Sequence, residues 1–194
     1  MRVLTLDRER FREECRRLAE MVAASGCMPR LVVGIATGGV VVMQSMKPVL
    51  NDLLAVKPSY FEISSRRPGT EVKEQRLKGL IRRLPRPVAN LLRIMEHVAG
   101  SLRRVRPPRR VVVPDGLVAA LRSVEKGAQV LVVDDALDSG ATMRDVVDSL
   151  HAVRGDIDIR TAVIASTRGR QAVKADFSLY GKNTLIRFPW SLDA

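Results

Sequence analysis

The sequence is poor in the residues that build disulfide scaffolds and metal centres. Its 194 residues include only two cysteines and two histidines. Cys15 and Cys27 lie in or just after a stretch with helical spacing, so we expect the reduced thiols of a cytoplasmic protein. His97 and His151 have no partners at the spacing of metal ligands, which argues against a zinc site.

Long apolar runs are also missing. No stretch of about 18 residues is both apolar and uncharged, as a membrane span requires. The first 20 residues are charged from the start and lack the apolar core of a signal peptide. An apolar content of 46% with 28% charged residues is typical of a globular protein. The length predicts a single domain over residues 1–194, with room for a large insertion.

Aromatic residues are scarce, and none lies between Phe61 and Phe177. This gap includes most of the basic segment, residues 61–110, which has 12 Arg and 2 Lys against 4 Glu and no Asp. Its net charge of +10 accounts for most of the +12 of the whole chain. Such a surface attracts polyanions, including nucleic acid, although a solvated helical face is the alternative. The missing aromatic rings argue against reading of single strands by base stacking.

Apolar spacing predicts strands alternating with helices. The expected strands are 30–36, 58–65, 130–133, 158–165 and 183–188, and the expected helices lie within 6–26, 38–54, 116–127 and 142–153. Asp7 is placed to cap the first helix. Near-continuous apolar strands between helices predict an α/β fold with a parallel sheet covered on both faces. Residues 66–127 offer no convincing core strand except 109–114, so we expect a mostly helical basic insertion there.

One stretch stands out, "AQVLVVDDALDSGATM" at 128–143. A buried strand ends there in two aspartates, Asp134 and Asp135, which are costly to bury unless they bind something. Asp138 to Thr142 then lead into a helix through a small turn. Amides at a helix start bind phosphate, and Gly140 permits either close approach of a ligand or an unusual backbone angle. We therefore expect a ligand with a phosphate beside sugar hydroxyls or Mg²⁺.

The segment "VLVVDDALDSGAT" resembles the phosphoribosyl diphosphate (PRPP) signature of the type I phosphoribosyltransferases. The resemblance implies that Asp134 and Asp135 contact the ribose hydroxyls and, indirectly, the Mg²⁺ cofactor. It assigns the 5′-phosphate to the loop that follows, formed by Asp138, Ser139, Gly140, Ala141 and Thr142. A plain helix cap would explain Asp138 but leaves the paired carboxylates unexplained.

A second turn, "GIATGG" at 34–39, is similar to the pyrophosphate loop of that family. Thr37, Gly38 and Gly39 would present backbone amides to the diphosphate. Many members have Arg or Lys where this chain has Thr37, so one positive contact is missing. Arg66 and Arg67 lie where the flexible loop of the family would begin and offer a replacement charge, although a plain basic turn is the alternative.

The C-terminal segment "DFSLYGKNTLIRFPW" is similar to the end of the 6-oxopurine branch of the family. Asp138 matches the aspartate that assists proton removal from the purine. Two departures count against a standard purine pocket: Leu185 stands at the position of the stacking aromatic, and residues 166–168 at that of a lysine. Trp190 is either a base contact or a core or interface residue.

The resemblance implies a Rossmann-like core and a pentosyltransferase that moves the phosphoribosyl group from PRPP to a nucleobase-like acceptor, releasing pyrophosphate. A cytoplasmic homodimer in nucleotide salvage is the expected setting. The alternative is a PRPP-sensing regulator of the same fold that binds nucleic acid through residues 61–110. A third hypothesis is a biosynthetic or stress-operon enzyme whose acceptor is neither purine nor pyrimidine.

Overall fold

The computed structural model describes residues 2–65, 106–167, 171–182 and 184–190. In these residues the strands are β1 (Arg2–Thr5), β2 (Leu31–Ala36), β3 (Ser59–Ser64), β4 (Gln129–Leu137), β5 (Asp158–Ser166), β6 (Phe177–Tyr180) and β7 (Thr184–Arg187). The helices are α1 (Arg8–Ala24), α2 (Gly38–Leu53), α5 (Asp115–Ser123) and α6 (Ala141–Val153). Asp7 caps α1 as predicted, accepting a hydrogen bond from the Arg10 amide at 2.8 Å.

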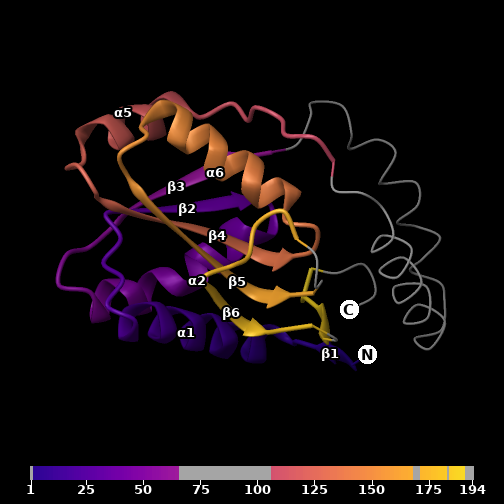
Figure 1. The fold of residues 1–194 in the computed structure, drawn as a ribbon. Coiled ribbons are helices and arrows are strands. Elements are labelled where there is room, and N and C mark those ends of the chain that lie inside the picture. The colour runs from indigo at the N-terminus through magenta and orange to yellow at the C-terminus, as the bar shows by residue number, and fades with distance from the viewer. Residues whose placement is uncertain (1, 66–105, 168–170, 183, 191–194) are drawn as a thin grey trace.

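The larger sheet has five parallel strands in the order β3-β2-β4-β5-β6. Helices α1 and α2 cover one face, and α5 and α6 cover the other, which gives three layers (Figure 1). Neighbouring strand residues point to opposite faces, so Val32 packs with α1 and α2 while Val33 packs with α5 and α6. Burial on both faces explains why the central strands are almost continuously apolar, and the predicted parallel α/β fold is confirmed.

A second, two-stranded sheet pairs β1 with β7 in parallel. It joins residues that are about 180 positions apart, since Arg2 pairs with Thr184 and Thr5 with Arg187. Behind it Phe11 of α1 meets two aromatic rings that follow β7, those of Phe188 and Trp190. Figure 1 shows β1 beside the carboxyl ends of the larger sheet's strands.

The sequence did not predict β1 or β6, and residues 109–114 form no strand. Helix α5 lies within the predicted insertion, yet its buried Leu117 and Leu121 belong to the same apolar core as the sheet and α6. Residues 66–105 lie outside the described residues, so the division of the chain at 66–127 stays a prediction. Among the described residues, no helix has the length and apolar character needed to cross a membrane.

Candidate functional site

The two predicted motifs meet where β2 and β4 end side by side. Gly34 of β2 pairs with Val133 of β4, so the turn after β2 lies against the residues that follow Val133. A Cβ on Gly38 would overlap the Asp135 carboxylate, and a Cβ on Gly39 would lie 2.8 Å from the Asp134 Cα. Only glycine fits this close approach of a helix start to a strand end.

Burial is the largest influence on the pKa values of the acidic pair, Asp134 and Asp135. It raises the pKa of Asp134 well above its ordinary value; the neighbouring Asp135 charge raises that pKa further, and the Gly39 amide opposes the rise. Burial also raises the pKa of Asp135, against hydrogen bonds that include one from the Ala136 amide at 2.8 Å. The Asp135 amide donates to Asp134 Oδ1 at 2.9 Å. A pair that resists full ionisation can both donate to and accept from sugar hydroxyls.

The phosphate loop, residues 138–142, turns from β4 into α6. Gly140 has the left-handed φ of 71° and immediately precedes the helix. A Cβ there would lie 2.9 Å from the Val173 carbonyl oxygen, so a neighbouring segment of the chain occupies the space beside Gly140. The unpaired amides and positive dipole end of the 13-residue α6 favour an anion at this turn.

Gln171 and Ala172, which the sequence did not single out, brace the phosphate loop. The Gln171 side chain donates to the carbonyl oxygens of Leu137 and Asp138 at 3.0 and 3.1 Å. The Ala172 amide donates to the Ser139 carbonyl at 2.9 Å. These contacts join residues about 30 positions apart, and no local pattern in the sequence announces them.

Asp138, the predicted general base, is exposed at the start of this loop. Its Oδ1 accepts a hydrogen bond from the Thr167 hydroxyl at 3.2 Å, which orients the carboxylate. Ser166, at the lysine position of the 6-oxopurine branch, exchanges hydrogen bonds with Gln171. Leu185 is half-buried in β7, and Thr37 is exposed at the start of α2. Arg66, Arg67 and Arg168 lie outside the described residues.

Trp190 brings an aromatic ring to the acidic pair. It stacks on Phe188 with centroids 5.0 Å apart and meets Phe11 edge-on at 4.9 Å, yet it remains 39% exposed. Its indole N–H is directed to Asp135 and opposes the rise in the pKa of that carboxyl. Of the two roles left open by the sequence, packing of Trp190 against the core is present, and contact with a base stays a prediction.

The acidic pair fits a metal ion that is shared with substrate oxygens. Mg²⁺ is commonly held by one or two carboxylates together with substrate phosphates and water. The described part of the chain has no group of three or more His, Cys, Asp and Glu side chains suited to hold a metal by themselves. Asp134 and Asp135 therefore suit an ion that arrives with its ligand.

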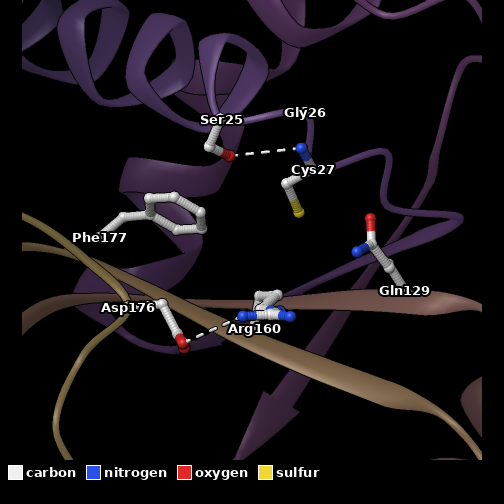
Figure 2. A pocket seen from close by; sticks show the side chains of 7 residues that line it. All are labelled: Ser25, Gly26, Cys27, Gln129, Arg160, Asp176 and Phe177. Atoms are coloured by element: carbon white, nitrogen blue, oxygen red, sulfur yellow. Dashed lines mark hydrogen bonds and ion pairs between the residues drawn. The ribbon is translucent and has the colours of Figure 1, made fainter.

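A cavity of about 290 Å³ lies at the opposite end of the sheet, among residues that begin β4, β5 and β6 (Figure 2). Its polar groups already have partners: Arg160 pairs with Asp158 and Asp176, and Gln129 bonds the Met28 amide and Asp158. Burial raises the pKa of the Cys27 thiol there. Cys15 and Cys27 are both free and buried. This cavity has no link to the acidic pair.

Comparison with solved structures shows the same fold at low identity. A purine phosphoribosyltransferase from Pyrococcus horikoshii has a TM-score of 0.58 and 17% identity, over 98% of this chain and 95% of that one. A xanthine-guanine-hypoxanthine phosphoribosyltransferase from Helicobacter pylori has a TM-score of 0.58 and 15% identity, over 97% and 92%. A hypothetical protein from Neisseria gonorrhoeae with bound ppGpp has a TM-score of 0.60 and 17% identity, over 97% and 89%.

The family comparison covers nearly the whole chain. No curated protein matches it at a significant level. The model of the phosphoribosyl transferase domain matches residues 5–193, which include the Gly38–Gly39 turn, the acidic pair and the phosphate loop. The chain therefore belongs to the phosphoribosyl transferase domain family.

Proposed function

We propose that the protein binds PRPP at the junction of β2, β4 and α6 and uses a 6-oxopurine-like base as acceptor. Family membership gives the reaction class, transfer of the phosphoribosyl group from PRPP to a base with release of pyrophosphate. The proposed site rests on the contact of Gly38 and Gly39 with Asp135 and Asp134, because it joins an amide-rich turn to paired carboxylates.

Each part of the junction suits one part of PRPP. The phosphate loop would hold the 5′-phosphate, and Asp134 and Asp135 would fix the ribose hydroxyls, which positions C1 of the sugar. Negative charge develops on the diphosphate as the C1–O bond breaks. Backbone amides of Thr37 and Gly38 would stabilise that charge. When bound, Mg²⁺ would supply further neutralisation of the diphosphate charge.

Asp138 is the proposed general base. The Thr167 hydroxyl holds its exposed carboxylate at the start of the loop. A carboxylate in this place can accept the proton that a purine nitrogen loses as the new bond to C1 forms. Two structures of similar fold are named as purine phosphoribosyltransferases, which supports a purine acceptor. Trp190 offers the aromatic surface that Leu185 does not.

Pyrophosphate release from PRPP and Mg²⁺ with a panel of purine and pyrimidine bases tests the acceptor. We expect release with hypoxanthine, guanine or xanthine. Release with pyrimidines alone would contradict the proposal, and PRPP binding without release for any base would favour an unusual acceptor. Calorimetric titration of the Asp134→Asn/Asp135→Asn double variant tests the site, because binding as tight as that of the wild type removes it.

A second proposal concerns residues 61–110 as a polyanion surface. The structure describes residues 61–65 and 106–110 of this segment, and Arg109 and Arg110 are exposed there. Lys and Arg contacts to phosphates dominate nucleic-acid affinity. A mobility shift of RNA or duplex DNA at about 150 mM salt would support the proposal of a polyanion surface, and the absence of a shift would contradict it. Size-exclusion chromatography tests the proposed homodimer.

A further inference from the structure

Asp145 is a buried carboxylate of α6 that no step of the proposed reaction uses. Its side chain is 1% exposed, and it forms ion pairs with Arg106 and, at 3.0 Å, with Arg144. Its Oδ1 also accepts a hydrogen bond from the Arg109 amide at 3.2 Å. A carboxylate so buried is tolerated only with such partners. The partners include both the helix itself and residues 106–111, which we call the strap.

Ser149, one turn further along α6, continues this attachment. Its hydroxyl accepts a hydrogen bond from the Val111 amide at 2.9 Å and donates to the Asp145 carbonyl at 2.7 Å. Arg144 adds a hydrogen bond to the Arg106 carbonyl at 2.9 Å. The strap is therefore bonded to α6 at Arg106, Arg109 and Val111, near both of its ends.

Apolar packing contributes less to this attachment. Pro107 and Pro108 of the strap are exposed, and Val112, the residue that follows the strap, is 86% exposed. A cavity of about 310 Å³ separates part of the strap from α5 and α6, and its lining includes Val111 and Val153. Val111 packs against the apolar core that includes α5 and α6, so the polar contacts of Asp145 and Ser149 hold the strap together with this packing.

The attachment lies close to the phosphate loop. Asp145 follows Gly140 by five residues, which is about 7.5 Å along a helix axis. The Arg144 amide donates to the Gly140 carbonyl at 2.9 Å, so the residue beside Asp145 belongs to the first hydrogen-bonded turn. We propose that Asp145 is a positioning residue, which ties the strap to α6 and thereby fixes the amides of the phosphate loop. This inference rests on the proposed PRPP site.

The charge change and the loss of positioning in Asp145→Asn have opposite effects on PRPP affinity, which makes the inference testable. Replacing Asp145 with Asn removes a negative charge near a site for anions, and that change by itself strengthens PRPP binding. Loss of positioning weakens it. Asp148→Asn is the matched control, because Asp148 lies on the same helix, is exposed, and loses the same charge.

The experiment measures PRPP binding by calorimetry in the presence of Mg²⁺, together with kcat and KM. We expect Asp145→Asn to weaken PRPP binding about tenfold and to raise KM more than it lowers kcat. Asp148→Asn should bind as the wild type does or slightly more tightly. Val22→Ala, on the buried face of α1, controls for a general loss of stability. Equal binding by Asp145→Asn and Asp148→Asn overturns the inference, as does an equal loss in Val22→Ala.

A second variant covers the case in which Asp145→Asn does not fold. Ser149→Ala removes only the hydroxyl that holds Val111, so we expect faster tryptic cleavage after Arg110 and weaker PRPP binding. In the wild type PRPP should slow that cleavage, because coupling between two sites is reciprocal. A cleavage rate that changes neither with the substitution nor with PRPP overturns the inference. A wild type that does not bind PRPP overturns the proposed function itself.

Discussion

Gly39→Ala probes the junction most directly. Gly39 lies in the first turn of α2, against the end of β4. A Cβ at this position would lie 2.8 Å from the Asp134 Cα and closer still to the Val133 carbonyl oxygen. Both are backbone atoms of a strand that is paired on both sides, so a side-chain rotation gives no relief. The turn must move by on the order of 1 Å to restore ordinary contact distances.

That displacement sets the size of both effects. Overpacking of this kind costs about 1–3 kcal/mol of unfolding free energy. A shift of about 1 Å in a positioning element costs roughly 100-fold in activity. Urea unfolding measures the first effect, and pyrophosphate release with calorimetric PRPP binding measures the second. Gly116→Ala in α5 is the control, since nothing lies within 4 Å of its Cβ; we expect it to gain about 0.5–1 kcal/mol.

The two glycine variants thus differ in the sign of their effect on stability. A Gly39→Ala protein that unfolds at the wild-type urea concentration and binds PRPP as tightly would refute the close approach of α2 to β4. Lost binding at unchanged stability would mean that the turn moves freely, and the packing argument would then be wrong.

Three further predictions concern single side chains. Burial and the Asp135 charge raise the folded-state pKa of Asp134, so the contribution of Asp134 to wild-type stability should be fully present below about 3.9, the unfolded pKa, and be lost as pH rises through the folded pKa. Urea titrations of Asp134→Asn should lack this loss; parallel curves would contradict the burial. Asp138→Asn should slow transfer to a purine about 10²–10⁴-fold with little change in PRPP affinity, and an unchanged kcat would exclude it as the base. The emission of Trp190, the only tryptophan, should change on PRPP binding and in Asp135→Asn, whereas an identical spectrum would separate the ring from the acidic pair.

The local sequence pattern was sufficient to predict the central strands of the fold. The apolar runs of β2 and β4 identified buried parallel strands, and Asp7 marked the start of α1. The ends of β2 and β4, which are separated by about 95 residues in the sequence, lie side by side at the strand carboxyl ends, where ligands bind in such sheets, but the sequence did not predict this pairing. The paired carboxylates drew attention because they have few purely structural explanations, whereas the glycine pair is also explained by the close approach of α2 to β4.

Contacts between segments that are distant in the sequence could not be predicted from it. Strand β6 has only half-buried residues, so it lacks the alternation that marks a strand. Pairing of β1 with β7 and the bracing of the phosphate loop by Gln171 depend on tertiary structure. The sequence left Trp190 as either a base contact or a core or interface residue, and only the packing of Trp190 on Phe188 and Phe11 defines where that ring lies.

The parallel pairing of β1 with β7 also sets an order of events during synthesis. Phe11 leaves the ribosome early, but its ring partners Phe188 and Trp190 emerge only after the larger sheet is complete. Until then a ring that is 4% exposed in the finished protein faces water, beside an unpaired β1. A chain halted before residue 184 therefore exposes the apolar Phe11 ring and the unpaired edge of β1, which chaperones or proteases can recognise.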